Sequence, residues 1–285
     1  MSMGMTARNR VWTIIWTTLS VLFAIVLIYP LLWMVGAAFK TNEEIFVNHH
    51  IIPSGKWVWD SFARGWKGVG RNTFSTFLLN SVKVAAPSVV FTIISTTLTA
   101  YGFARFRFMG RKVLFFIMIG MLMLPNAVIM VPTFILFKEL GWLNSYKPLI
   151  IPTAFAVNSF LIYMMIQFMR SIPRDFDESA TIDGCNSFQT LFHIIVPMCM
   201  PAMLSCGLFE FMWKWNDYFN AMLYVNSAKK FTVTLGLRAS FDSSTGVMWN
   251  QVMAMSFISI LPCIVVFFSL QKYFVEGLAA GGLKG

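Results

Sequence analysis

Long apolar segments separated by short polar ones run through the whole chain. Five of them contain no charged residue, and each is at least as long as the roughly 20 helical residues that cross a bilayer core. They are residues 11–39, 84–104, 113–137, 148–169 and 243–271. A sixth segment, near residues 200–225, is also apolar but contains Glu210, Lys214 and Asp217. The pattern predicts an all-α polytopic membrane protein with six transmembrane helices.

The composition supports a membrane protein. Hydrophobic residues make up 57% of the chain and charged residues 12%, against about 25% charged in soluble domains. The first apolar segment is too long for a removable signal peptide and lacks a small-residue cleavage site. The net charge of +10 is explained by basic residues that flank spans and face anionic lipid. We therefore expect contacts with membrane lipid and no nucleic-acid partner.

The polar segments divide the chain into an N-terminus, a first helix, a long loop, a core with five further helices, and a tail of small residues expected to be extended. These parts are residues 1–10, 11–39, 40–76, 77–275 and 276–285. The core contains a polar loop at residues 170–199 and a second long loop at residues 226–250.

The orientation follows from one short basic loop. Arg105, Arg107, Arg111 and Lys112 lie within eight residues, between the second and third predicted helices. The positive-inside rule places such a loop in the cytoplasm. Six spans then place both termini and residues 170–199 in the cytoplasm. The prediction rests on this loop, because the totals of Lys and Arg on the two sides are nearly equal.

Proline lies inside several predicted spans, where it interrupts the helical hydrogen-bond ladder. These prolines are Pro30, Pro87, Pro125, Pro132, Pro152 and Pro262. Broken helices mark moving segments in transporters, but a proline can also produce a static kink. For the segment "LPNAVIMVP", both interpretations remain open.

The cysteines and histidines show no metal-binding spacing. We interpret the cysteines as small apolar core residues and the histidines as solvated or packed. They are Cys185, Cys199, Cys206, Cys263, His49, His50 and His193. We expect this chain to bind no metal and no cofactor of its own, and it lacks the H-E-x-x-H pattern that would suggest an intramembrane enzyme.

The polar loop has the signals of a first short helix. Pro173 suits the first turn of a helix, and Asp175 with Glu178 has the spacing of a capping box. Gly184 suits the left-handed residue that follows a helix. The sequence therefore predicts a helix that ends near Asp183.

A second short helix should follow. Asn186 and Gln189 repeat the capping-box spacing. The residues Phe188, Leu191, Phe192 and Ile195 would form one apolar stripe. Because the polar residues of this loop are mainly acidic, the loop should bind anionic lipid poorly. We expect it to dock onto a protein, through a small face around Ser179, Ala180 and Gly184.

The same loop resembles the EAA loop of ABC-importer permeases, whose pattern is E-A-A, three residues, G, nine residues, I-x-L-P. The chain has Glu178-Ser179-Ala180, then Gly184, then Ile194-Ile195-Val196-Pro197 at that spacing. It departs from the pattern at Ser179 and Val196. The resemblance implies a helix that sits in a cleft of a cytoplasmic ATPase. The implied ATPase-coupling residues are Glu178, Ser179, Ala180, Gly184, Ile194 and Pro197.

Three further segments resemble maltose-type carbohydrate-uptake permeases. They are "YPLLWMVGAAFKTNEEIF", "FMWKWNDYFNAMLYV" and "LQKYFVEGLAAGGLKG". The resemblance implies the type I importer (MetI-like) permease fold and a bacterial-type cell membrane. It also implies a second homologous permease subunit, a cytoplasmic ATPase dimer that holds ATP and Mg, and an external sugar-binding protein.

The sixth apolar segment holds the candidate substrate path. Charged residues inside a span usually face the interior or a water-filled path. Spacings of four and three put Glu210, Lys214 and Asp217 on one helix face, although they could also neutralise one another or pair with a partner subunit. The candidate path residues are Glu210, Trp213, Lys214, Asn216, Asp217 and Asn220, with Asn126 and Asn158 as weaker candidates.

The chain has no G-x-x-x-x-G-K-[ST] motif, so an ATPase has to be a separate chain. We interpret the protein as the non-catalytic permease subunit of an ATP-driven importer for a carbohydrate, with an oligosaccharide expected. The alternative is a self-contained secondary transporter or channel for a polar solute. That alternative predicts an internal repeat and paired broken helices, and the sequence shows neither clearly.

Overall fold

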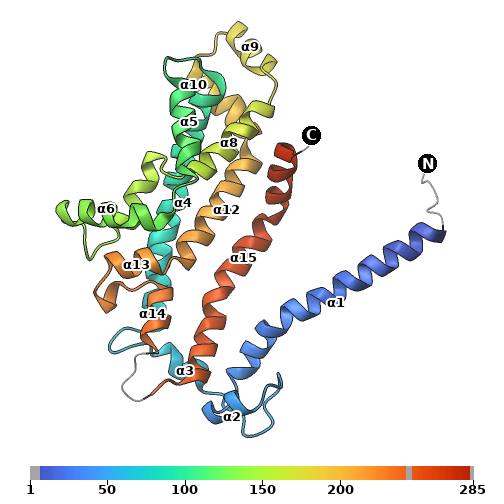
Figure 1. Ribbon diagram of the computed structural model, residues 1–285, viewed down its shortest axis with the longest axis vertical. Coiled ribbons are helices and arrows are strands. Elements are labelled where there is room, and N and C mark those ends of the chain that lie inside the picture. The colour runs from blue at the N-terminus through green and yellow to red at the C-terminus, as the bar shows by residue number, and fades with distance from the viewer. Residues whose placement is uncertain (1–6, 242–245, 283–285) are drawn as a thin grey trace. The chain divides into compact units, whose positions relative to one another are not determined.

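The computed structural model describes the backbone of residues 7–241 and 246–282, and these residues are predominantly helical (Figure 1). Contacts divide the chain into two units. Unit 1 comprises Met1–Gly68 with Ala239–Ser259, and unit 2 comprises Val69–Arg238 with Ile260–Gly285. The predicted all-α fold is confirmed.

Unit 1 contains α1 (Ala7–Ala37), α2 (Asn42–Val47), α3 (Ser61–Trp66) and the first part of α15 (Trp249–Gly282). A fully buried lysine organises its loop. The Lys40 ammonium donates to the carbonyl oxygens of Asn48 and His50, at 2.7 and 2.5 Å, and so fixes the chain that follows α2. The Asn250 amide donates to the Lys40 carbonyl at 3.2 Å, which connects the start of α15 to this loop.

The centre of unit 2 is formed by three helices, α4 (Phe74–Arg105), α8 (Ser159–Ser171) and α12 (Met200–Asn216), with α4 packed against both of the others (Figure 1). The buried face of α4 is rich in Ala, Ser and Thr. Small side chains let helix backbones approach closely where no water drives association. Their hydroxyls also satisfy buried carbonyls, as when Ser95 donates to the Thr153 carbonyl at 2.8 Å.

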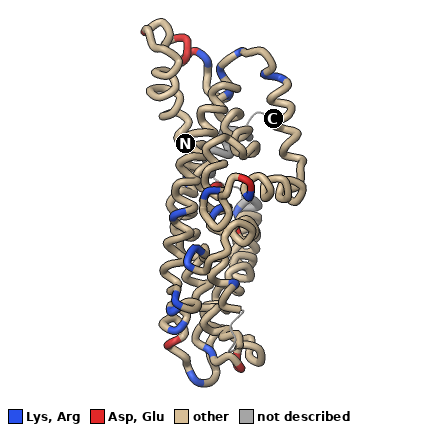
Figure 2. The backbone as a smooth tube through the Cα atoms, turned by 90° about the vertical axis from the view of Figure 1, so that its left-hand side faces the viewer, with Lys and Arg blue, Asp and Glu red and all other residues tan. Residues whose placement is uncertain are grey.

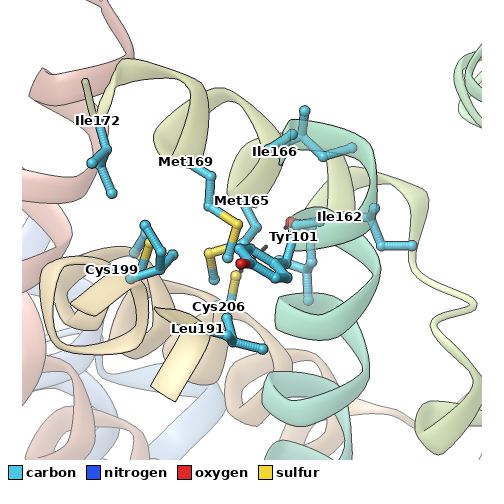
Figure 3. Close-up of a cluster of buried hydrophobic side chains, with 14 of the residues drawn as sticks. Tyr101, Ile162, Met165, Ile166, Met169, Ile172, Leu191, Cys199 and Cys206 are labelled. Carbon is cyan, nitrogen blue, oxygen red and sulfur yellow. Dashed lines mark hydrogen bonds between the residues drawn. The ribbon is translucent and has the colours of Figure 1, made fainter. Parts of the chain in front are cut away.

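Shorter elements surround this centre. They are α5 (Arg111–Met121), α6 (Asn126–Glu139), α7 (Lys147–Ile150), η1 (Ile151–Phe155), α9 (Asp175–Ile182), α10 (Ser187–Thr190), η2 (Leu191–Ile195), α11 (Val196–Met198), α13 (Phe219–Tyr224), η3 (Ala228–Lys230) and α14 (Val233–Ala239). The largest buried cluster joins α4, α8, the π-helical η2 and α12 (Figure 3). In it, Tyr101, Met165, Met169, Leu191 and Cys206 pack together, so the polar loop is anchored in the core of the unit.

Four helices among the described residues are long and apolar enough to cross a membrane: Trp12–Ala37, Phe74–Arg105, Lys147–Ser171 and Trp249–Tyr273. Two bent pairs meet the same test, α5 with α6 at 104° and Ser187–Met198 with α12 at 75°. The predicted six spans are reached when each bent pair counts as one.

The uncharged run 113–137 is therefore not a straight helix. Pro125 has an extended backbone and is the N-cap of α6, so the chain turns between α5 and α6. The residue before a proline is disfavoured in the α conformation, which explains why the helix stops ahead of Pro125. Within "LPNAVIMVP" the chain breaks at Pro125, and the helix continues through Pro132.

One further expectation differs from the structure. The tail that begins at residue 276 is not extended, because α15 continues to Gly282. Ala279 and Ala280 favour a helix and the apolar residues before them already form one, so the helix propagates. The predicted loop 226–250 contains η3 and α14, while its residues 242–245 lie outside the described part of the chain.

A network of hydrogen bonds orders the chain around α13. Asn144, which has φ +54°, accepts at its side-chain oxygen from the amides of Asn226 and Ser227 at 3.3 and 3.1 Å. Tyr146 donates to the Lys230 carbonyl at 3.0 Å, and burial raises the pKa of Tyr146 to about 12. The phenol therefore stays protonated and keeps donating throughout the physiological pH range.

The contact between α14 and α4 leads to a prediction about stability. A Cβ on Gly236 would lie 2.2 Å from the ring of Phe77, which is fully buried. We expect Gly236→Ala to destabilise the chain by about 3 kcal/mol, because the ring has no free space to move into. The thermal unfolding midpoint in detergent measures the effect. Gly120→Ala is the control, since a Cβ there meets nothing within 4 Å; equal midpoints for the two variants would contradict the prediction.

Candidate functional site

A polar cavity of 1110 Å³ lies within unit 2. It is formed by side chains of α4, α6, α8, α12 and α13 and by the turns between them. All six predicted path residues line it, and so do the two weaker candidates. These are Glu210, Trp213, Lys214, Asn216, Asp217, Asn220, Asn126 and Asn158. The structure therefore brings the predicted residues of α12 and α13 together with Asn126 at the start of α6 and Asn158 just before α8.

Glu210 and Lys214 form the ion pair of this cavity. The carboxylate oxygen Oε1 lies 3.8 Å from the Lys214 ammonium, one helical turn along α12. Glu210 is buried, at 3% exposure, whereas the Lys214 side chain is 20% exposed. A buried carboxylate needs a compensating charge, and Lys214 supplies it from the cavity side. The mutual neutralisation considered for this pair is thus present, and Lys214 still faces the cavity.

Asp217 does not share the helix face of that pair, contrary to the prediction. Helix α12 ends at Asn216, and Asp217 has an extended backbone. Its carboxylate accepts from the backbone and side-chain amides of Asn220, at distances of 3.0 to 3.2 Å. An aspartate just before a short helix satisfies free amides of its first turn, and this local bond outweighs continuation of the helix. Asp217 therefore shapes the entry to α13 while it lines the cavity.

Trp213 supplies an aromatic surface. It is 44% exposed, stacks on Phe209 with ring centroids 5.6 Å apart, and meets the ring of Phe160 edge-on at 6.0 Å. These two neighbours hold one face of the indole and leave part of it accessible. Tyr224 of α13 is buried against Phe134 and Phe137, so it offers no comparable surface.

The hydroxyl groups of the cavity wall were not predicted from the sequence. Thr92, Ser95 and Thr96 of α4 line it, as do Thr133 and Thr153. The first three have the spacing i, i+3, i+4 within "FTIISTTLTA", which places them on one helix face. That spacing could have indicated a polar wall, since small hydroxyl residues in a span belong either to a helix-packing face or to a polar path.

The candidate coupling loop begins with α9. The predicted capping box at Asp175 is wrong: Asp175 is the first helical residue, and the N-cap is Arg174, which makes no side-chain capping bond. The end of α9 agrees with prediction. Gly184 has φ +83°, its amide donates to the Thr181 carbonyl at 3.1 Å, and the Cys185 amide donates to the Ala180 carbonyl at 2.9 Å. This is the Schellman arrangement, and its left-handed residue favours glycine.

The second capping box is confirmed. The Asn186 side chain accepts from the Gln189 amide at 2.9 Å, and the Gln189 side chain accepts from the Asn186 amide at 2.8 Å. The predicted apolar stripe, however, is divided. Leu191 and Ile195 are buried, while Phe188 and Phe192 are 70% and 56% exposed. The π-helical turn η2 widens the helix and rotates the stripe, so two of its members leave the core.

Most of the residues matched to the EAA pattern are accessible. Glu178, Ser179, Gly184 and Pro197 are exposed, Ile194 is half-buried, and Ala180 is buried. Ile182, beside Gly184, is 86% exposed. The loop therefore presents both polar and apolar side chains to its surroundings.

The loop is tied to the end of α4 by a set of contacts that the sequence did not reveal. Arg105 Nε lies 3.2 Å from the Asp177 carboxylate, as an ion pair without hydrogen-bond geometry. The two terminal nitrogens of Arg105 donate to the Ile172 carbonyl at 3.2 Å. Tyr101 donates to the Ser187 carbonyl at 3.1 Å. These contacts connect both short helices to α4, which also lines the polar cavity.

Comparison with known proteins gives a consistent result. A family model described as "Binding-protein-dependent transport system inner membrane component" matches residues 92–279. The probable ABC transporter permease protein YurM of Bacillus subtilis (strain 168) is 34% identical over 96% of this chain and 89% of its own length. The trehalose/maltose transport system permease protein MalG of Thermococcus litoralis is 30% identical over 93% of this chain and 95% of its own length.

A solved structure has the same fold. It is that of a bacterial ABC transporter involved in the import of the acidic polysaccharide alginate, with a TM-score of 0.80 and 24% identity. The match covers 96% of this chain and 100% of the solved one. At this identity the likeness shows the fold alone.

Proposed function

We propose that this chain, which belongs to the family of binding-protein-dependent transport system inner membrane components, is a permease subunit that carries a carbohydrate across the cell membrane. It is a transport component rather than an enzyme. A separate cytoplasmic ATPase dimer, which binds ATP and Mg, would provide the energy, since the chain has no phosphate-binding loop motif of its own.

The observation that carries this proposal is the polar cavity. Its wall combines hydroxyl groups, side-chain amides, one ion pair and the accessible part of an indole ring. A sugar offers hydroxyl groups that donate and accept, and an apolar face that packs on an aromatic ring, so this wall matches sugar chemistry. A cavity of 1110 Å³ exceeds what a single small ligand needs, which favours an oligosaccharide.

The relatives support the carbohydrate assignment. Their names include transport systems for trehalose and maltose and for galactooligosaccharides. A second homologous permease would complete the pathway, and an external sugar-binding protein would deliver the substrate. The cavity then takes up the sugar from one side and releases it to the other, by alternating access.

The coupling loop supplies the mechanical link. Ile182 and Phe188 are apolar and exposed, as expected of residues that insert into a cleft of the ATPase. When the ATPase dimer closes, it would move α9 and α10 together, and the contacts of Arg105 and Tyr101 would carry that movement into α4. Because α4 lines the cavity, closure of the ATPase would change the shape of the path.

The orientation follows from the same arrangement. The basic residues that follow α4 lie at the end of unit 2 that carries the acidic helix α9 (Figure 2). With the coupling loop at the ATPase, this end faces the cytoplasm, as the positive-inside rule expects. Both termini would then lie in the cytoplasm.

Variants of the cavity test the proposed path. We expect Trp213→Ala and Asn216→Ala to raise the transport KM, or lower the uptake rate, by about ten-fold, because each removes a contact with the sugar. The measurement is ATP-dependent uptake of labelled sugar into proteoliposomes that contain the complete transporter, with its binding protein outside. Phe116→Ala is the control, since Phe116 is 79% exposed and does not line the cavity. Unchanged uptake by both variants would remove these residues from the path.

A further inference from the structure

A second cavity, of 680 Å³, lies where α4 passes into α5. Its wall contains four cationic side chains and no carboxylate. They are Arg107, Arg111, Lys112 and Arg170, and the remaining lining residues are Phe108, Gly110, Val113 and Phe115. We call it the basic cavity. It is separate from the polar cavity described above, because the two share no lining residue.

The four positive charges of the basic cavity are uncompensated. Among the side chains that the structure describes, none of the four forms an ion pair. Arg107, Arg111 and Lys112 also have no acidic neighbour in the sequence, since residues 61–138 contain no Asp or Glu. Like charges gathered in a partly enclosed space produce a strong positive potential, which a bound anion would relieve.

Two of the cations are held in place by neutral partners. One terminal nitrogen of Arg111 donates to the Phe103 carbonyl at 2.6 Å. The Arg170 guanidinium lies over the ring of Phe115, 5.2 Å from its centroid. These contacts orient the two side chains without neutralising them. The basic cavity is therefore a preformed site for an anion with several acceptor oxygens, and arginine suits phosphate in particular.

The rim of the basic cavity is apolar on the side of α5. Val113, Leu114 and Phe116 are 62%, 50% and 79% exposed, and from residue 113 onward α5 carries no charged residue. A soluble phosphate would gain nothing from such a rim, and neither would an acidic protein surface. A molecule with a phosphate group and long apolar chains would satisfy both parts at once.

We propose that the basic cavity binds the headgroup phosphate of an anionic phospholipid, whose acyl chains lie along the exposed face of α5. The headgroup contacts Arg107, Lys112 and Arg170, while Arg111, the first residue of α5, closes the site from the position fixed by its bond to the Phe103 carbonyl. The lipid bound here would sit beside Arg105, one residue before the loop that carries Arg107. Only the assignment of this lipid to the cytoplasmic leaflet of the membrane rests on the proposed function.

Binding of defined lipids to the purified full-length chain tests the proposal. Native mass spectrometry would follow a titration with phosphatidylglycerol, and with phosphatidylcholine for comparison. We expect retention of phosphatidylglycerol, and about twenty-fold weaker binding by Arg107→Gln/Arg170→Gln, because each basic side chain contributes about five-fold near an anionic headgroup. The control is Lys138→Gln/Lys147→Gln, which removes two exposed charges outside the cavity and should leave binding unchanged.

Three outcomes would overturn the proposal. They are equal binding of the two lipids, unchanged affinity in the Arg107→Gln/Arg170→Gln variant, and displacement of the lipid by millimolar inorganic phosphate. Lys112→Gln alone tests the same site if the double variant misfolds, because Lys112 is exposed. It should weaken binding about five-fold. None of these measurements involves sugar transport, so a failure here is distinguishable from a failure of the proposed function.

Discussion

Replacing Phe188 with aspartate is expected to release the chain from its ATPase. Phe188 is 70% exposed on α10, and the capping box of Asn186 and Gln189 fixes the helix that presents it. Central aromatic residues dominate the energy of protein interfaces, so losing this one should weaken the association about thirty-fold or more. Copurification of the ATPase with the tagged chain, together with ATP hydrolysis stimulated by the binding protein, provides the measurement.

Two comparisons make the result specific to the coupling loop. Val47→Asp places the same charge on a residue that is 84% exposed in α2, and we expect it to retain the ATPase. Gly184→Asp should act like Phe188→Asp, because Gly184 has φ +83° and a side chain there strains the turn between α9 and α10. If Gly184→Asp leaves both assembly and stimulated hydrolysis intact, the loop does not dock the ATPase.

Replacing Arg105 with alanine is expected to separate ATP hydrolysis from transport. The substitution removes the ion pair with Asp177 and two hydrogen bonds to the Ile172 carbonyl, and it leaves Asp177 without its partner. The loop should still dock, since its exposed face is unchanged, but its movement would no longer reach α4. We expect sugar uptake per ATP hydrolysed to fall about ten-fold, which corresponds to about 1.4 kcal/mol of lost coupling.

Arg174→Ala is the matched control for this experiment. Its guanidinium also reaches α4, at the Ala104 carbonyl, but the distance of 3.5 Å marks a weak bond. The ratio of uptake to hydrolysis should therefore remain near that of the unmodified transporter. In Arg105→Ala/Asp177→Ala the uncompensated carboxylate is gone, and we expect partial recovery of stability without recovery of coupling. If Arg105→Ala leaves the ratio of sugar uptake to ATP hydrolysis unchanged, the movement of the loop does not reach α4 through Arg105.

The parts of the fold that depend on local sequence were predictable. The apolar segments gave the helical membrane fold, because their length alone distinguishes a span from a soluble helix. The turn at Gly184 and the capping box at Asn186 were also predicted, because each is decided by residues within one helical turn of each other. The family model matches residues 92–279, a range that includes this loop.

The predictions that failed depended on competition between local signals. Asp175 had the spacing of a capping box but became the first residue of α9. Asp217 was expected on the helix face of Glu210 and Lys214, but α12 ends before it and its carboxylate accepts from the Asn220 amide. Spacing alone does not fix the residue at which a helix begins or ends. In the same way, the uncharged run 113–137 gave no measure of how far the chain bends at Pro125.

The contacts that link the loop to the cavity could not be predicted at all. Arg105 counted only as one basic residue in a short loop, and its pairing with Asp177 depends on how α4 and α9 meet in space. The hydroxyls of Thr92 and Ser95 likewise become a cavity wall only when α6 and α12 face them. Long-range packing assigns these roles, and the spacing along one helix contains no information about it.

The four cysteines have a practical consequence for studying this transporter. Cys199 and Cys206 are fully buried, Cys263 is 8% exposed, and all three are shielded by the helix bundle. Cys185 alone is partly accessible, and it directly follows Gly184 in the turn between α9 and α10. The unmodified chain thus carries a single natural attachment point for a thiol-reactive fluorophore, at the position where engagement of the ATPase would be observed first.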